Sequence, residues 1–265
     1  MKTSKRIIIS LVLVSIGIVL ILASLSLSAF FGDGLTFGTE SFTKIIENNV
    51  KTIDINYASC KIVIEEGDEF KLVAKNIKKN SMDYSIDGGS LKVSMKSSIF
   101  NMINFNNTAS IKLYVPKDVI LNTVDLDCGA GVISVSNIKS DLISLKGGVG
   151  LSEIENIVAD SITIEGGVGK IVAENVSSHD IKISGGVGQI EFDGEVLGDC
   201  DIVSGIGEVS FTTNTPKSDF NFDLSNGIGD LTINGMSYHD FDNNTNGKYE
   251  MKIENGIGQI KLFFE

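Results

Sequence analysis

The sequence predicts an all-β protein: a single-stranded β-solenoid with rungs of about 19 residues, preceded by one N-terminal transmembrane helix. Three observations lead to this prediction. A glycine-rich motif recurs at a constant interval, apolar residues alternate on either side of it, and a long uncharged segment lies near the N-terminus. A β-sandwich made of the same strands is the alternative architecture.

The uncharged segment predicts a membrane anchor. Residues 7–30 carry no charge, and as a helix they would be roughly 36 Å long, enough to cross a hydrocarbon core of about 30 Å. Three basic residues within 1–6 precede the segment, so the positive-inside rule places the N-terminus in the cytoplasm and the rest of the chain outside. A cleaved signal peptide is the competing interpretation, because Ser26, Ser28 and Ala29 offer a processing site.

These features divide the chain into four segments. We expect a basic cytoplasmic tail (1–6), a transmembrane helix (7–30), a linker (31–44) and an extracytoplasmic β-repeat domain (45–265). The predicted location is the cell membrane, which the chain crosses once. The membrane is thus the first expected partner.

Before the repeats, short apolar-alternating segments predict strands at 51–65, 70–74, 90–96 and 111–115. The Asp87-Gly88-Gly89 triplet predicts a hairpin turn. Residues 97–108 predict an exposed loop whose apolar cluster either caps the solenoid or faces a membrane or a partner.

A glycine motif defines the repeats, which we place in residues 122–265. The motif reads LKGGVG at 145–150 and weakens to CGAG at 128–131. The last glycines of the copies are Gly131, Gly150, Gly169, Gly188, Gly207, Gly229 and Gly258. Their intervals are 19, 19, 19, 19, 22 and 29 residues, which predicts insertions near 214–218 and 237–248. Loops of a sandwich vary in length, so four equal intervals favour the solenoid.

Each repeat predicts two short strands joined by a tight corner. Apolar residues at alternate positions flank the glycines, as Ile181 and Ile183 precede one corner and Ile190 follows it. Glycine allows positive φ angles and close backbone approach there. The residue between the last two glycines is always apolar, and we expect these residues to form an inward core ladder: Val149, Val168, Val187, Ile206, Ile228 and Ile257. Seven stacked rungs would make a stem roughly 34 Å long.

Charge and cysteine content narrow the possible partners. The chain has a net charge of −12, and because residues 1–6 contribute +3, the part from residue 31 onward carries −15. Such a domain repels nucleic acid, so no nucleic-acid partner is expected. Cys60, Cys128 and Cys200 lack C-x-x-C spacing, which argues against a zinc site and favours buried apolar roles.

No motif predicts catalysis, a cofactor or a metal. The GGVGK segment at 166–170 lacks the Ser/Thr and the helix of a phosphate-binding loop. Calcium-binding glycine repeats need an aspartate two positions after the last glycine, where this chain has residues such as Ile171 and Ile190. His179 and His239 each adjoin an aspartate but no nucleophile motif. Outward acids, among them Glu191 and Glu208, are expected to form a solvated face.

Three segments before the repeats, together with the repeats themselves, carry a family resemblance. IDINYASCKIVIEEGDEFKLVA (53–74) is followed by LKVSM (91–95), IKLYVPKDV (111–119) and then the glycine corners. The chain resembles the bacterial putative-adhesin family of β-strand-repeat domains (domain of unknown function 4097) and is more distantly similar to the C-terminal domains of LiaF-type envelope-stress regulators. The resemblance implies a β-solenoid on the outside of a bacterium, with no catalytic residues to transfer. Where that family often has Ser or Thr before a corner glycine, this chain mostly has Gly or Asn.

The expected function is a non-catalytic, membrane-anchored, extracytoplasmic adhesin-like protein that binds an envelope ligand such as a cell-wall polymer. An accessory regulator of an envelope-stress signalling system, with a membrane-protein partner, is the first alternative. A polysaccharide-active β-helix enzyme is the second, since such enzymes share the architecture.

Overall fold

The computed structural model describes residues 39–46, 49–95, 109–238 and 246–265, which form an all-β unit. In chain order its strands are β1 (Thr39–Ile45), β2 (Thr52–Gly67), β3 (Lys71–Lys78), β4 (Met82–Asp87), β5 (Ser90–Met95), β6 (Ser110–Pro116), β7 (Ile120–Ser136), β8 (Lys139–Val196), β9 (Cys200–Thr213), β10 (Phe220–Ile233), β11 (Met236–Tyr238) and β12 (Tyr249–Phe264). A short 3₁₀-helix, η2 (Lys217–Asp219), lies between β9 and β10.

Two of the predicted segments lie outside the described residues: the membrane helix at 7–30 and the apolar loop at 97–108. Among the residues that are described, no helix is long and apolar enough to span a membrane. The strands begin at Thr39, inside the segment expected to be a linker (31–44), because β1 pairs antiparallel with β3.

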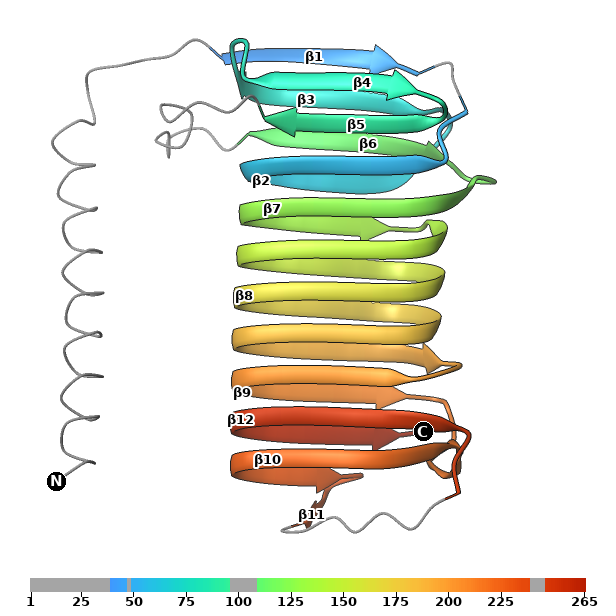
Figure 1. The fold of residues 1–265 in the computed structure, drawn as a ribbon, viewed down its shortest axis with the longest axis vertical. Helices are drawn as coiled ribbons and strands as arrows, with labels where there is room; N and C mark the ends of the chain where they lie inside the picture. Colours follow the sequence, from blue (N-terminus) through green and yellow to red (C-terminus); the bar gives the residue numbers. More distant parts are fainter. Residues whose placement is uncertain (1–38, 47–48, 96–108, 239–245) are drawn as a thin grey trace, which may run out of the picture. The chain divides into compact units, whose positions relative to one another are not determined.

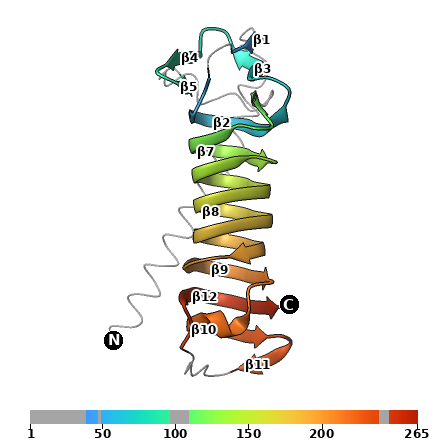
Figure 2. The same cartoon turned by 90° about the vertical axis from the view of Figure 1, so that its right-hand side faces the viewer.

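The repeats form a β-solenoid, as the constant spacing predicts. Strands β2, β7, β8, β9, β12 and β10 stack in parallel, and the long β8 winds through three rungs by itself (Figures 1 and 2). The pairing keeps the corners in line, with Gly131 opposite Gly150 and Gly188 opposite Gly207. Parallel pairing of consecutive rungs rules out the β-sandwich alternative, whose sheets are antiparallel.

The stack differs from the expected one at both ends. The β2 strand is an additional first rung whose corner lacks glycine, since Cys60 lies opposite Gly131. At the other end β12 inserts between β9 and β10, so that Gly258 pairs with both Gly207 and Gly229. The predicted insertions fall where the chain needs extra length, around η2 and between β10 and β12.

Antiparallel strands cap the first rung. Strands β1, β3 and β6 form a small antiparallel sheet, and β6 then pairs in parallel with the second half of β2. The β4–β5 hairpin adds β5 beside the first half of β2. Its turn is the predicted one: Gly88 and Gly89 have φ angles of 56° and 79°, which suits a two-residue turn of type I′.

The core is a column of aliphatic side chains between the two faces of the coil. Each rung contributes residues at alternate positions, such as Ile183 and Ile190, which are 1 % and 2 % exposed. Burying one such side chain stabilises the fold by about 1.5–3 kcal/mol. Near the C-terminal rungs the rings of Phe192 and Phe211 stack with centroids 4.6 Å apart. All three cysteines are buried, as expected.

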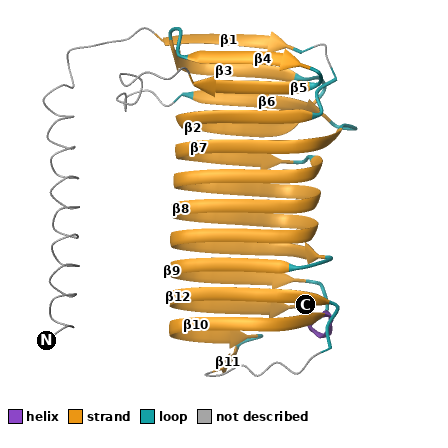
Figure 3. Cartoon of the chain, in the orientation of Figure 1, coloured by secondary structure: helices purple, strands orange, loops and turns teal. Residues whose placement is uncertain are grey.

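The two long edges of the solenoid are built differently. The glycine corners turn within continuous strand, whereas the loops gather at the opposite edge (Figure 3). That opposite edge carries an asparagine ladder, formed by Asn137, Asn156 and Asn175, with φ angles of 54°, 54° and 50°. Each side-chain amide donates a hydrogen bond to the asparagine of the preceding rung. Asn156 Nδ2 donates to Asn137 Oδ1 at 2.9 Å, and Asn175 Nδ2 donates to Asn156 Oδ1 at 2.6 Å. Asparagine is favoured here because it tolerates the left-handed conformation.

Candidate functional site: the glycine corner

In every rung from β7 onward the corner contains two glycines at positions where a side chain would point into the neighbouring rung. Gly169 has a φ of 143°, and a Cβ there would overlap the carbonyl oxygen of Gly150 in the preceding rung. A Cβ on Gly167 would in the same way overlap the carbonyl oxygen of Gly148. Only glycine lets neighbouring rungs approach to β-sheet distance at both positions.

The residue between these two glycines points outward, so the expected inward ladder is wrong. The six side chains of this corner ladder are between 47 % and 69 % exposed. In stacking order they are Val149, Val168, Val187, Ile206, Ile257 and Ile228. Strict alternation would turn Val187 inward after Ile183 and Gly185, but the corner glycines rotate the chain and break the alternation. The inward role passes to residues beyond the corner, such as Ile190.

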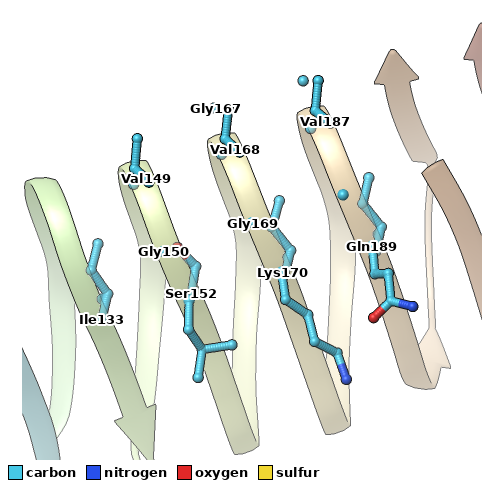
Figure 4. Close-up of a pocket in the computed structure, with 18 of the residues that line it drawn as sticks. Ile133, Val149, Gly150, Ser152, Gly167, Val168, Gly169, Lys170, Val187 and Gln189 are labelled. Atoms are coloured by element: carbon cyan, nitrogen blue, oxygen red, sulfur yellow. The ribbon is translucent and has the colours of Figure 1, made fainter. Parts of the chain in front are cut away.

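The corner ladder is a continuous apolar ridge. Figure 4 shows Val149, Val168 and Val187 at the same place on three successive rungs, pointing the same way. Six rungs spaced by about 4.8 Å give a ridge roughly 24 Å long. Exposed aliphatic residues scattered singly are ordinary, but a regular row of them is typical of a contact surface.

A shallow groove runs beside the ridge over four rungs. It encloses about 620 Å³ and is open to solvent along its length. We call it the glycine groove. It is lined by Asp127, Gly129, Lys146, Gly147, Gly148, Glu165, Gly166, Gly167, Ser184, Gly185 and Gly186. The floor is therefore backbone without side chains, and the outer wall carries an alternating set of polar groups: a carboxylate, an ammonium, a second carboxylate and a hydroxyl.

On the other flank of the ridge the polar groups neutralise one another. Lys170 Nζ lies 2.7 Å from Glu191 Oε2, and Lys261 Nζ lies 2.9 Å from Glu208 Oε1. Lys170, the lysine of the GGVGK segment, therefore lies in β8 as an ion-pair partner. Two of the outward acids expected to form a solvated face are likewise engaged in ion pairs across rungs, which at such exposure contribute at most about 1 kcal/mol each.

The remaining polar clusters offer weaker candidates. His179 Nδ1 lies 3.8 Å from Asp160 Oδ1 on an exposed part of β8, and His239 lies outside the described residues. In the described part of the chain no three His, Cys, Asp or Glu side chains converge as metal ligands would. A cavity of about 20 Å³ under the corner has room for about one water molecule. A second depression of about 330 Å³ lies at the asparagine edge, near Asn175 and Glu195.

Three of these features were missed by sequence reasoning. The asparagine ladder repeats at the same interval of 19 residues as the glycines, from Asn137 to Asn175, so its period was available as a signal. The first rung has the same apolar pattern around its corner, with Ile55 before and Ile62 after. The groove has no such signal, because it follows from the outward direction of the corner ladder.

The comparison with family models places the chain in one family. The sequence model of the Toastrack family, DUF4097, matches residues 50–246. This match confirms the resemblance to the adhesin-like β-strand-repeat family, whereas the similarity to LiaF-type domains stays a prediction. No curated protein matches the sequence.

Several solved bacterial structures are similar to this chain. A putative adhesin from Bacteroides fragilis is 14 % identical, with 86 % of this chain and 100 % of that one covered and a TM-score of 0.49. A putative cell adhesion protein from Clostridium sporogenes is 16 % identical, with the same coverage and a TM-score of 0.40. A putative lipid binding protein from Parabacteroides distasonis is 14 % identical over 84 % of this chain and 96 % of its own, with a TM-score of 0.36.

Proposed function

Because the chain belongs to the Toastrack family, we propose that it is a non-catalytic, adhesin-like binding protein of the bacterial cell envelope. In this proposal residues 7–30 hold it in the cell membrane and the solenoid lies outside. The apolar run and the basic residues before it support this placement. The ligand is a linear, neutral wall glycan that lies along the glycine groove and the corner ladder.

The observation that carries this proposal is the repetition of the surface. The groove presents the same glycine backbone on each rung that it crosses, and the ridge has Val or Ile at every one of its six positions. A surface with a short, constant repeat suits a polymer of repeating units, because each unit meets an equivalent contact. A small molecule, by contrast, is usually enclosed in a pocket that buries most of its surface, and the groove is open along its length.

Charge and chemistry select a neutral glycan among polymers. The part of the chain from residue 31 onward carries −15, which disfavours polyanions such as nucleic acids or teichoic acids. The glycine floor and the ridge match the C–H faces of sugar rings. Lys146, Glu165 and Ser184 on the groove wall supply donors and acceptors for hydroxyl groups.

The test uses full-length protein in detergent and isolated bacterial cell walls in a co-sedimentation assay. We expect binding to the walls, and we expect the substitution Val168→Glu to reduce it at least tenfold, because a carboxylate in the ridge has to be desolvated. Val158→Glu is the matched control: Val158 is 52 % exposed against 51 % for Val168, but it lies at the opposite edge. Equal binding by both variants would refute the groove as the site.

The same experiment separates the alternatives. Release of soluble saccharide from the walls would indicate a polysaccharide-active enzyme. A regulator would be indicated by two results together. The protein would not bind to the walls, and in cells it would crosslink to one membrane protein. That crosslink would be lost when residues 7–30 are replaced by an unrelated span.

A further inference from the structure

Two of the three cysteines lie side by side inside the first two rungs. Cys60 is on β2 and Cys128 is on β7, and their Sγ atoms are 3.5 Å apart. Both side chains are buried, at 0 % and 1 % exposed. The Cys128 thiol also lies 3.3 Å from the carbonyl oxygen of Cys60. The two residues are 68 positions apart in the chain, so the contact is made only by the folded stack.

This pair lies at the first corner of the solenoid, at one end of the stack of rungs. On the side facing away from β7, strand β2 pairs with β5 over Thr52–Asn56 and with β6 over Lys61–Gly67. Among the described strands none pairs with residues 57–60 on that side. Among the described strands the first corner is therefore held by one neighbouring rung, like the last corner on β10, whereas interior corners are held by two. Opening of the first corner would expose the core beneath it.

We propose that Cys60 and Cys128 form a disulfide that fastens the first rung to the second once the chain meets an exchangeable disulfide outside the cytoplasm. The dependence on an oxidising compartment rests on the export that the proposed function assumes. A disulfide requires about 2.05 Å between the sulfurs. Each sulfur thus has to move by less than about 1 Å.

The chemistry is a two-step exchange with an external disulfide, such as that of a thiol oxidoreductase. The thiolate of either Cys60 or Cys128 attacks one sulfur of that disulfide, and the other sulfur leaves as a thiolate. The remaining cysteine then loses its proton and attacks the Sγ of the first, which expels the second thiolate. The two cysteines are oxidised, the external disulfide becomes two thiols, and no other oxidant is consumed.

Once the corner is closed, the two thiols have different environments. The hydrogen bond from Cys60 stabilises the Cys128 thiolate and lowers the pKa of Cys128 to about 7. The same hydrogen bond, together with burial, raises the pKa of Cys60. Because both thiols are buried in the closed corner, the exchange occurs while the β2 corner is still open during folding, before this hydrogen bond forms. Either thiol is then able to attack first.

Cys200 is an internal control. It is also buried, at 1 % exposed, but its register partners in the neighbouring rungs are Ile181 and Met251. Burial raises the pKa of its thiol. It is buried like the pair, but neither of its register partners is a cysteine.

The experiment refolds the reduced full-length protein, in detergent, with oxidised and reduced glutathione. Free thiols are then alkylated in denaturant, disulfides are reduced, and a second alkylating reagent labels the released thiols. Peptide mass spectrometry is expected to find the second label on Cys60 and Cys128 and the first on Cys200. First label on both Cys60 and Cys128, or a mixed disulfide with glutathione as the end product, would overturn the proposal.

A thermal measurement is independent of the labelling. Oxidised protein is expected to melt about 5–15 °C above the reduced form, since a crosslink over this loop length stabilises a chain of this size by that order. The difference should persist in Cys200→Ser and vanish in Cys60→Ser and Cys128→Ser. Equal differences in melting temperature between the oxidised and reduced forms of all three variants would contradict the disulfide. Neither readout involves glycan binding or export, so failure here is distinct from failure of the proposed function.

Discussion

Replacing Gly169 by alanine should destabilise the solenoid more than almost any other addition of a single methyl group. Two effects combine at this position. The φ angle of 143° lies in a region that costs an L-residue about 1–3 kcal/mol. The new Cβ would also overlap the Gly150 carbonyl oxygen, which is backbone and cannot rotate away. Separating the two rungs locally would weaken their hydrogen bonds, and we expect a total loss of about 3–5 kcal/mol.

Two other glycines isolate these effects. Gly88 has a φ of 56° and no atom within 4 Å of an added Cβ, so Gly88→Ala measures backbone strain alone, about 1–2 kcal/mol. At Gly166 no positive φ is required, and the added Cβ would meet Ile171 Cδ1 at 3.0 Å, the flexible end of a side chain. Gly166→Ala should therefore change stability by less than about 1 kcal/mol.

Urea denaturation followed by far-ultraviolet circular dichroism compares the three variants. Solenoids need not unfold in a single step, so hydrogen exchange within β8 should accompany the midpoints. We expect the order of loss Gly169→Ala, then Gly88→Ala, then Gly166→Ala. If Gly169→Ala costs no more than Gly88→Ala, close approach of the rungs does not explain the corner glycines.

Three further predictions concern other parts of the stack. Val168→Ser should change the free energy of unfolding by less than about 0.5 kcal/mol, because the side chain is half exposed. Ile164→Ser, at a fully buried position, should lower it by at least about 3 kcal/mol. Similar melting temperatures for the two variants would contradict the outward direction of the corner ladder. Asn156→Gly should lower the free energy of unfolding by about 1–2 kcal/mol, because it removes two hydrogen bonds of the asparagine ladder. Asn156→Ala should lower it by about 1 kcal/mol more, because alanine is strained at a φ of 54°. Urea midpoints measure both losses, and the reverse order would be incompatible with the left-handed conformation. Thr215→Val should lower the free energy of unfolding by about 1–3 kcal/mol and speed amide hydrogen exchange at Val196. The reason is that the Thr215 hydroxyl accepts a hydrogen bond from the N–H of Val196 and donates one to its C=O. An unchanged exchange rate would show that water replaces the hydroxyl.

The solenoid was predictable from the sequence because its main constraint repeats. Corner glycines spaced by 19 residues force every rung to have the same length, and the alternating isoleucines on either side show which face is buried. The direction of the corner ladder was not predictable by alternation. Period two holds only in extended strand, and between Gly186 and Gly188 the chain is turning, so Val187 faces solvent. The candidate site was missed for this reason.

The order of the last rungs was also beyond the reach of pattern reasoning. The corners at Asn226–Gly229 and Asn255–Gly258 have the same sequence, Asn-Gly-Ile-Gly, so either fits equally well beside β9. What decides between them is the packing of whole strands, such as Phe211 opposite Leu262. The first rung escaped notice because Cys60 takes the place of a glycine.

The position of β12 affects how the protein is made. Ribosomes synthesise β12 after β10, yet β12 lies between β9 and β10 in the finished stack. The rungs up to β9 are able to add one by one as the chain emerges, but β10 has only the short strand β11 as a permanent partner until β12 arrives. Assembly therefore ends with an insertion, and loss of the 16 residues of β12 (Tyr249–Phe264) would remove two interfaces and leave β10 and β11 without a parallel neighbour.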